Sequence, residues 1–219
     1  MSQLYKDNHR ALQDEFGTRA LADRVEEAIF ATEFDDASRA YIGAVDFFFL
    51  ATVDGEGQPT VSYKGGFLGF VKITGPSTLV FPNYDGNGMF LSMGNLAGTR
   101  KIAMLFIDFV KPSRMRLKGE ASILRDSPLL AEYPEANFLV QVEVTGIWAN
   151  CPRYVHRYER VESSRYVPEA GKQTPLAGWK RRADVQDVLR PEDAARAKEE
   201  GLLTGDEYTE RMATGHPEA

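Results

Sequence analysis

The sequence holds a single cysteine, Cys151, among its 219 residues. One cysteine cannot form a disulfide within the chain or a thiolate metal cluster. The three histidines, His9, His156 and His216, are far apart and lack the spacing of metal ligands. These scarcities argue against a disulfide-stabilised scaffold and against a zinc site.

Basic charge and long apolar runs are scarce as well. The formal net charge is −6, and the one compact basic run is WKRR at 179–182. Non-specific nucleic-acid binding needs a broad basic field, so we expect no nucleic-acid partner. No apolar run approaches the roughly 20 residues that span a bilayer, and the N-terminal stretch lacks the apolar core of a secretory signal. We therefore expect a cytoplasmic protein without a membrane partner.

The glycine motifs of the common nucleotide-binding folds are absent. There is no G-x-G-x-x-G between a strand and a helix, and no Walker A sequence. The composition, 43% hydrophobic and 11% aromatic, is nevertheless that of a globular chain with a sizeable core. Any bound phosphate would therefore be held by strand and loop residues.

The sequence pattern predicts three parts: a helical cover over 1–45, a β-rich domain over 46–160, and a loop and helical extension over 161–219. Residues 18–33 carry apolar side chains at helical spacing after Thr18, a plausible N-cap. A second short helix follows Asp35 or Asp36. Two further short helices are expected in 191–212, on either side of Gly201.

The middle of the chain is rich in strand patterns. The expected strands cover 46–53, 58–64, 67–73, 78–84, 101–109, 114–124 and 138–149, with a short helix near 89–98. Several connections have the length of hairpin turns, which predicts a mainly antiparallel sheet. So many strands around one apolar core favour a barrel over an open sheet.

One strand carries a pattern that suits an anion. In QPTVSYKGG, residues 58–66, Ser62 and Lys64 are two apart and so share one face of the strand. An ammonium and a hydroxyl can converge there on a phosphate, and Gly65 and Gly66 allow a ligand to approach the backbone. The alternative is a solvent-facing strand that ends in a simple bend.

Two further stretches support a ligand. The sequence PNYDGNGMFLSMGNLAG leads from a strand through a glycine-rich loop into a helix, whose free N–H groups attract anions. Asn87, Ser92 and Asn95 would add side-chain donors, although such a loop can also lack any ligand. In RMRLK, Arg114 is the cation that we expect at the edge of a heterocycle, whereas Lys118 is expected on a solvated face.

The ordered series FFLATVDGEGQPTVSYKGGFLGFVKI, TLVFPNYDGNGMFLSMGNL, KIAMLFIDF and RMRLKGEASI resembles the flavin-binding split-barrel proteins related to pyridoxamine 5′-phosphate oxidase. The resemblance covers about residues 45–160, and CPRY at 151–154 is similar to a segment near the end of many such domains. It implies an α+β fold that is mainly β, an antiparallel split β-barrel, with FMN bound at the interface of a homodimer.

The resemblance also implies which residues bind the cofactor. Ser62, Lys64 and Gly65 fall on the cofactor strand, and Asn83 and Tyr84 fall where the ring or ribityl chain is contacted. The phosphate loop and helix, the ring edge and the CPRY segment supply the remaining expected cofactor-binding residues: Asn87, Ser92, Asn95, Arg114 and Arg153.

The chain departs from the oxidase itself, because Leu91 and Ser92 stand where the oxidase has an Arg-Lys pair and the C-terminal segment differs. We therefore expect an FMN-dependent oxidoreductase for an unidentified small-molecule substrate, with NAD(P)H or O2 as partner, rather than pyridoxamine phosphate oxidation.

A non-catalytic flavin store or sensor is the alternative, as is a barrel for a deazaflavin or for haem with His156 as axial ligand. A protein-interaction role for 191–212 is a third possibility. No residue stands out as a catalytic acid or base.

Overall fold

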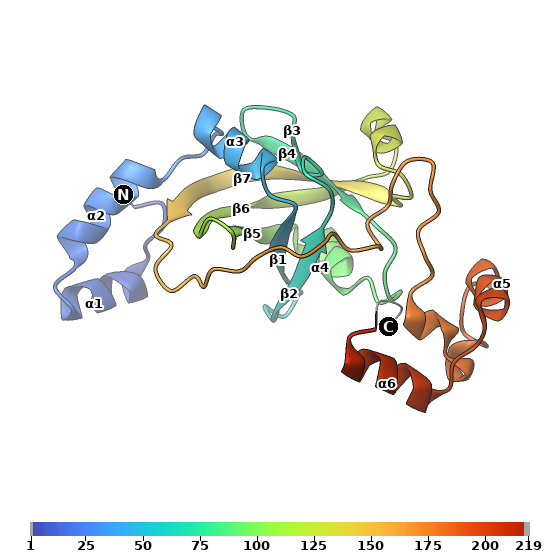
Figure 1. Cartoon of the computed structure of the whole chain (residues 1–219). Helices are drawn as coiled ribbons and strands as arrows, with labels where there is room; N and C mark the ends of the chain where they lie inside the picture. Colours follow the sequence, from blue (N-terminus) through green and yellow to red (C-terminus); the bar gives the residue numbers. More distant parts are fainter. Residues whose placement is uncertain (1, 217–219) are drawn as a thin grey trace. The chain divides into compact units, whose positions relative to one another are not determined.

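The computed structural model describes residues 2–216 and divides into two compact units, with the division between Glu162 and Ser163. The first unit holds the strands and four helices (Figure 1). Its elements in chain order are α1 (Asp7–Glu15), α2 (Arg19–Ile29), α3 (Asp36–Gly43), β1 (Phe47–Val53), β2 (Pro59–Gly65), β3 (Lys72–Ile73), β4 (Thr78–Asn83), α4 (Leu91–Thr99), β5 (Lys101–Asp108), β6 (Ser113–Leu124), the 3₁₀-helix η1 (Pro128–Glu132) and β7 (Phe138–Asn150).

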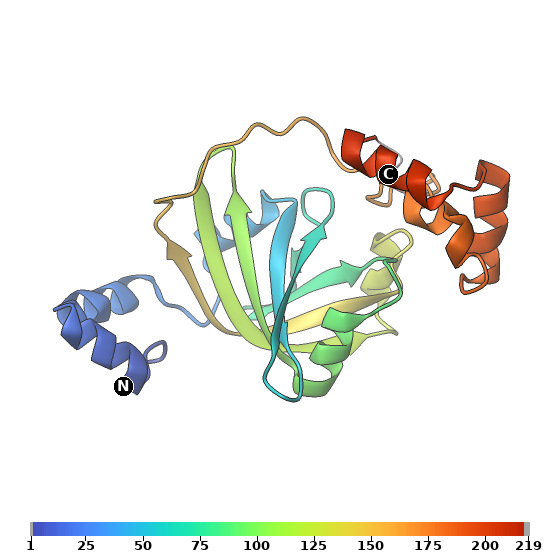
Figure 2. The ribbon, with the colours of Figure 1, turned by 90° about the horizontal axis from the view of Figure 1, so that it is seen from below.

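The strands form one antiparallel sheet with the order β2-β1-β5-β6-β7-β4-β3. The sheet is not closed, but it curls around a single core, as Figure 2 shows. Phe48 on β1 packs edge-on against Phe81 on β4, with ring centroids 5.0 Å apart, although three strands separate β1 from β4 in the sheet. The fold is therefore the α+β antiparallel split barrel that the sequence predicts.

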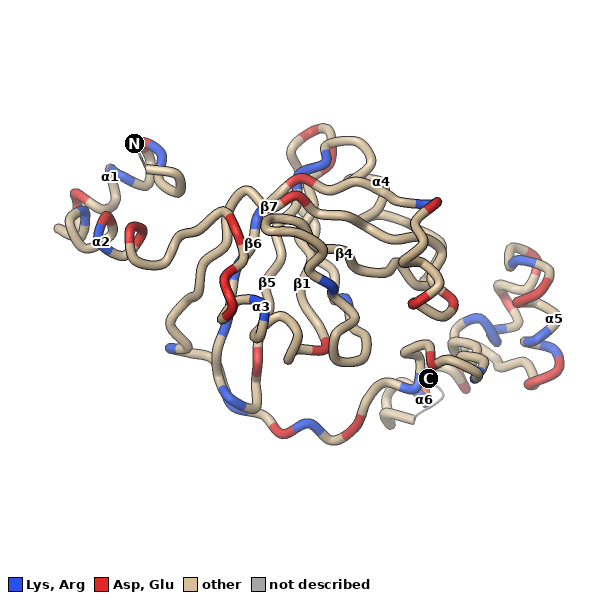
Figure 3. Tube along the Cα trace, turned by 90° about the horizontal axis from the view of Figure 1, so that it is seen from above, with Lys and Arg blue, Asp and Glu red and all other residues tan. Residues whose placement is uncertain are grey.

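The core strands owe their burial to composition. Neither β1 nor β4 contains a charged residue, so Figure 3, in which Lys and Arg are blue and Asp and Glu are red, draws both strands in tan. Phe48 lies at the centre of the core and also contacts Phe70 and Phe106, with ring centroids 5.7 and 5.3 Å away. Aromatic side chains bury more apolar area than any others, so this cluster contributes strongly to the stability of the barrel.

The expected strand over 67–73 is wrong for most of its length, because only Lys72–Ile73 pairs with β4. Gly69 adopts a φ of +80°, which a strand does not contain, and the N–H of Phe70 donates to the carbonyl of Phe67 in a tight turn. The turn carries Phe70 and Val71 into the core instead of along an edge.

The N-terminal helices are tied to the barrel by β6 and β7. Ala31 pairs with Ile147, and the Lys118 ammonium donates to the carbonyl of Gln3 over 3.3 Å. Lys118 also lies 5.6 Å from the centre of the Phe30 ring. Lys118, expected on a solvated face, is thus partly covered by the N-terminal segment.

Of the helix N-caps expected from the sequence, the one at Asp35 forms a side-chain hydrogen bond and the one at Thr18 does not. Asp35 caps α3 by accepting from the backbone N–H of Ser38, as one of the two expected caps. Thr18 precedes α2 but makes no side-chain cap hydrogen bond. Helix α1 was not predicted, because its sequence DNHRALQDE has too few apolar residues to show a helical period.

The second unit contains η2 (Gly178–Arg181), η3 (Ala183–Val185), α5 (Pro191–Glu200) and α6 (Gly205–Thr214). Helices α5 and α6 are the two expected on either side of Gly201. A small core of Leu176, Ala197 and Leu203 supports the unit. The buried ammonium of Lys180 pairs with Asp193 over 2.9 Å, which fixes η2 on α5.

Candidate functional site

The side chains of Thr60, Ser62 and Lys64 face the inside of the barrel. In the β1–β2 ladder, Lys64 is paired with Phe48, Ser62 with Leu50 and Thr60 with Thr52. Paired residues of an antiparallel ladder point to the same face, and the three β1 partners are 0% exposed. The hydroxyl-and-ammonium face predicted from the sequence is therefore the inner face, not a solvated one.

Helix α4 lies against this face through polar contacts. Ser92 and Ser62 are joined by a hydrogen bond of 3.1 Å between their hydroxyls. The side-chain amide of Asn95 donates to the hydroxyls of Thr52 and Thr60 over 3.3 and 3.5 Å. One turn later, Thr99 donates to the carbonyl of Val53 over 2.7 Å.

These contacts fix the direction of α4 along β2. From Thr99 through Asn95 to Ser92, the helix contacts move along β2 toward its C-terminal end. Lys64 follows Ser62 on the same face, about 7 Å further along the strand. Lys64 therefore lies on the strand face that continues past Ser92 toward the first turn of α4.

The start of α4 has no side-chain cap from the residue that precedes it, within the part of the chain that the structure describes. Phe90 precedes the helix with φ +48° and ψ +25°, and no side chain caps the first turn. The first N–H groups of a helix have no partner within the helix, and they carry the positive end of its dipole. A non-glycine residue in left-handed conformation is uncommon and often marks a functional position.

Lys64 is the charged group at this place. Its side chain is half-buried, and among residues 2–216 its ammonium makes no hydrogen bond or ion pair. Burial lowers the pKa of Lys64 below its ordinary value, because the charged form loses water and gains no counter-charge. Ser62, Lys64, Ser92 and the first turn of α4 thus form a cationic corner, the name used below for these groups.

The two glycines after Lys64 make room for the protein's own rings. A Cβ on Gly65 would lie 2.8 Å from the ring of Tyr63, and one on Gly66 would lie 2.4 Å from the buried ring of Phe70. Gly65 also faces away from Lys64, because it is the next residue along the strand. The space above both glycines is therefore already used within the chain.

Asn83 and Tyr84 lie at the end of β4, where the loop toward α4 begins. Asn83 is buried, and its carbonyl accepts from the N–H of Asn137 over 2.9 Å. Burial raises the pKa of Tyr84. Near it, Tyr133 has a buried hydroxyl without a hydrogen-bond partner in the described part of the chain, and burial, with Tyr84 and Glu132, raises its pKa further.

The remaining predicted site residues lie apart from the cationic corner. Asn87 accepts from the N–H of Met89 over 3.1 Å and so shapes the loop before α4. Arg114 lies on β6 beside Met115, which faces the core, so the Arg114 side chain points to the outer face of the sheet. Its Nε donates to the carbonyl of Cys151 over 3.1 Å, and the exposed Arg153 lies two residues beyond that cysteine. The structure thus brings together Ser62, Lys64, Ser92 and Asn95, but does not join them to Arg114 or Arg153.

Sequence reasoning missed three threonines of this region: Thr52, Thr60 and Thr99. Thr60 has a signal, because it alternates with Ser62 and Lys64 on one face. Thr52 and Thr99 have no such sequence signal, because a threonine near the end of an apolar strand or of a helix is common. Tyr133, in the η1–β7 connection, likewise has no motif around it.

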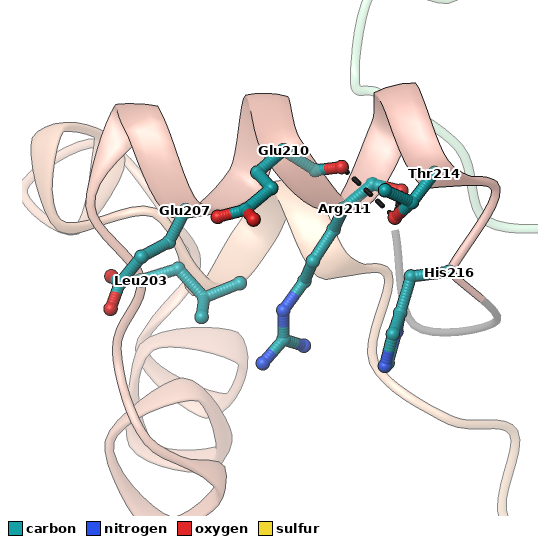
Figure 4. A pocket seen from close by; sticks show the side chains of 6 residues that line it. All are labelled: Leu203, Glu207, Glu210, Arg211, Thr214 and His216. Atoms are coloured by element: carbon teal, nitrogen blue, oxygen red, sulfur yellow. Dashed lines mark hydrogen bonds between the residues drawn. The ribbon is translucent and has the colours of Figure 1, made fainter.

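A separate hollow lies along α6 in the second unit. Its volume is about 230 Å³, and Figure 4 shows the side chains that line it: Leu203, Glu207, Glu210, Arg211, Thr214 and His216. Thr204 caps α6, because its hydroxyl accepts from the backbone N–H of Glu207, and Thr214 donates to the carbonyl of Glu210 over 3.0 Å. No predicted site residue lines this hollow.

His156 is exposed between β7 and η2, and residues 2–216 contain no group of three His, Cys, Asp or Glu side chains suited to a metal ion.

None of the helices in the described residues is long and apolar enough to cross a membrane.

Several solved structures are similar to part of this chain. HupZ from Group A Streptococcus is 16% identical, covers 57% of this chain and 99% of its own, and has a TM-score of 0.44. An FMN-binding protein from Syntrophomonas wolfei is 14% identical, covers 64% and 97%, and has a TM-score of 0.41. HutZ, described as a haem storage protein from Vibrio cholerae, is 16% identical, covers 53% and 94%, and has a TM-score of 0.40.

No curated protein sequence matches the chain. The sequence pattern of the family described as pyridoxamine 5′-phosphate oxidase matches residues 34–148, which is more than half of the chain. The matched range begins two residues before α3 and ends within β7, so it contains β1 to β6, most of β7 and the cationic corner. The chain therefore belongs to the pyridoxamine 5′-phosphate oxidase family.

Proposed function

We propose that the chain binds FMN and serves as an oxidoreductase that acts on a small-molecule substrate, with NAD(P)H or O2 as redox partner. The observation that carries this proposal is the ammonium of Lys64, half-buried and unpaired in the described residues, at the uncapped start of α4. Such an arrangement suits a dianionic phosphate. Membership of the family supports the choice of a flavin nucleotide.

The cationic corner matches a phosphate group in charge and in donors. Lys64 supplies a positive charge, and the first turn of α4 supplies N–H groups at the positive end of its dipole. The hydroxyls of Ser62 and Ser92, which are 3.1 Å apart, can each turn a proton toward an oxygen of the ligand. A bound phosphate would also restore the pKa of Lys64, because it provides the counter-charge that burial withholds.

When bound, FMN supplies the hydride or electron chemistry, and the protein supplies position and electrostatics. The cationic corner would hold the phosphate end. Burial keeps Tyr84 and Tyr133 protonated at neutral pH, since it raises the pKa of both, so both can donate a hydrogen bond to a ligand. We assign no catalytic acid or base, and the substrate class is left open beyond a small molecule.

We also propose that the protein is a homodimer. The outer face of β2, β1 and β5 is apolar, although antiparallel sheets usually turn polar side chains to water. Val61 and Tyr63 on this face are 67% and 61% exposed. The other side chains on it are Pro59, Phe47, Phe49, Ala51, Val53, Ala103, Leu105 and Ile107, with the charged Lys101 at the end of β5.

A second copy suits this face because a two-fold interface places the same patch on itself, and the patch carries its charge, Lys101, only at the end of β5. Val61→Lys should convert the dimer to a monomer in sedimentation experiments, because a charge cannot be buried there unpaired. Thr145→Lys, at an exposed position of β7, is the matched control. A monomeric wild-type chain would refute the dimer.

The single free cysteine, Cys151, fits a reducing compartment such as the cytoplasm.

The functional proposal is tested by titration with FMN, followed by visible absorbance and flavin fluorescence, and then by anaerobic addition of NADH or NADPH. We expect a bound flavin spectrum that bleaches with a reduced nicotinamide or reoxidises with O2. Binding without any redox turnover would favour the flavin store or sensor instead. Failure to bind FMN, with binding of haem or a deazaflavin, would overturn the choice of cofactor.

A further inference from the structure

The polar contact between α4 and the β1–β2 pair is unusual for a helix packed on a barrel. Met93 and Leu96 turn to the apolar core, as expected for a covering helix. A second face of the same helix, formed by Ser92, Asn95 and Thr99, meets strand hydroxyls and a strand carbonyl instead. Residues spaced by three and four lie on one side of a helix, so this face is continuous.

At the centre of this contact is a group of three side chains. Thr52 is 0% exposed, and its hydroxyl lies 3.0 Å from the hydroxyl of Thr60. The side-chain amide of Asn95 donates to both hydroxyls. Because the two hydroxyls are close together, they lie in nearly the same direction from the amide nitrogen, so one N–H of Asn95 is shared between both oxygens.

Hydrogen bonds place a helix more narrowly than apolar contacts do. Apolar attraction is non-directional and allows a helix to slide, whereas a hydrogen bond weakens steeply outside a short range of distance and angle. The Thr52–Thr60–Asn95 group therefore fixes where α4 lies along β2. It lies one turn from Ser92, so it also fixes how far the first turn of α4 is from Lys64.

We infer that Thr52, Thr60 and Asn95 are positioning residues: they align the first turn of α4 with Ser62 and Lys64, and they determine phosphate affinity without touching the ligand. This inference rests on the proposed function for the identity of the ligand. It assigns Asn95 a different role from the direct cofactor contact that the family resemblance implies, because its side-chain amide contacts strand hydroxyls inside the barrel.

The test compares the affinities for FMN and for riboflavin, which lacks the phosphate, in three variants. Thr60→Val keeps the shape of the side chain but removes the hydroxyl, Thr60→Ser keeps the hydroxyl, and Asn95→Leu removes the amide. We expect Thr60→Val and Asn95→Leu to weaken FMN about tenfold, the effect of one lost hydrogen bond. Riboflavin affinity should stay unchanged, and Thr60→Ser should restore FMN binding. Thr145→Val, an exposed threonine of β7, is the matched control.

Two results would overturn the inference. If Thr60→Val weakens FMN and riboflavin equally, the group only stabilises the fold. If Asn95→Leu weakens FMN far more than Thr60→Val does, Asn95 contacts the ligand directly.

A second readout separates this inference from the proposed function. Backbone amide NMR signals of Leu91, Ser92 and Met93 should shift in Thr60→Val without any ligand, and should return in Thr60→Ser. If the wild type binds no flavin but these shifts occur, the proposed function fails and the positioning role stands. Unchanged signals would refute the positioning role whether or not FMN binds.

Discussion

Replacement of Lys64 by methionine should make the free protein more stable and the FMN complex weaker. Methionine keeps the length and apolar stem of the side chain but removes the ammonium, which is half-buried and, within residues 2–216, has no partner. Burial of an unpaired charge costs free energy, so its loss should raise the free energy of unfolding by about 0.5–2 kcal/mol. For a chain of this size, each kcal/mol shifts Tm by about 2–4 °C.

The same substitution should raise the Kd for FMN about 10- to 100-fold. A hydrogen bond to a charged group contributes about 1.5–3 kcal/mol, and about 1.4 kcal/mol corresponds to a factor of ten. The Kd for riboflavin should not change, because riboflavin has no phosphate. Calorimetry or fluorescence quenching measures both constants, and Lys101→Met, at an exposed position of β5, is the matched control.

The pH dependence of the free protein has a definite sign. Burial lowers the pKa of folded Lys64 below that of the unfolded chain. Between these two pKa values the unfolded state binds more protons, so stability rises with pH in that window. This rise should be absent in Lys64→Met when both are measured below about pH 9.5, before tyrosines ionise. A variant that loses stability, or that loses FMN and riboflavin affinity alike, would refute the reasoning.

Two further predictions concern packing and charge. Gly66→Ala should lower the free energy of unfolding by about 1–3 kcal/mol, because its Cβ would lie 2.4 Å from the Phe70 ring, whereas Gly55→Ala, with no atom within 4 Å, should change it little in urea titrations. Asp193→Asn should destabilise the second unit by about 3–5 kcal/mol, because it removes the carboxylate charge that pairs with the buried ammonium of Lys180, and Glu27→Gln in an exposed ion pair should have little effect. Burial alone would raise the pKa of Asp193, but hydrogen bonds from Lys180 and Arg190 outweigh it and lower the pKa, so this stability should be lost as pH falls through that lowered value. Equal unfolding curves for either variant and its control, or no loss of stability in acid, would contradict these accounts.

Most of the fold could be predicted because the strands repeat with clear periods and are separated by glycine-rich turns. The segment 67–73 misled, since FLGFVKI reads as a strand and only the positive φ of Gly69 reveals the turn. Helix α1 was missed because a polar, solvent-exposed helix has no apolar period.

The site was predicted in part for the same reason. Alternation placed Ser62 and Lys64 on one face, and the glycine-rich loop indicated a helix start near Ser92. The inner face of β2 is defined by its pairing with Phe48 and Leu50 of β1. The sequence of β2 alone does not show which strand it pairs with, so it does not show which of its faces is the inner one. Arg114 shows the same limit, because its outward direction follows from the burial of Met115.

The location of the phosphate in a crystal of the FMN complex tests the central claim most directly. The account predicts the phosphorus within hydrogen-bonding reach of the Lys64 ammonium and of the Ser92 backbone N–H, with the Ser62 and Ser92 hydroxyls turned toward its oxygens. A phosphate bound on the outer face of the sheet, beside Arg114, with Lys64 still unpaired, would contradict it.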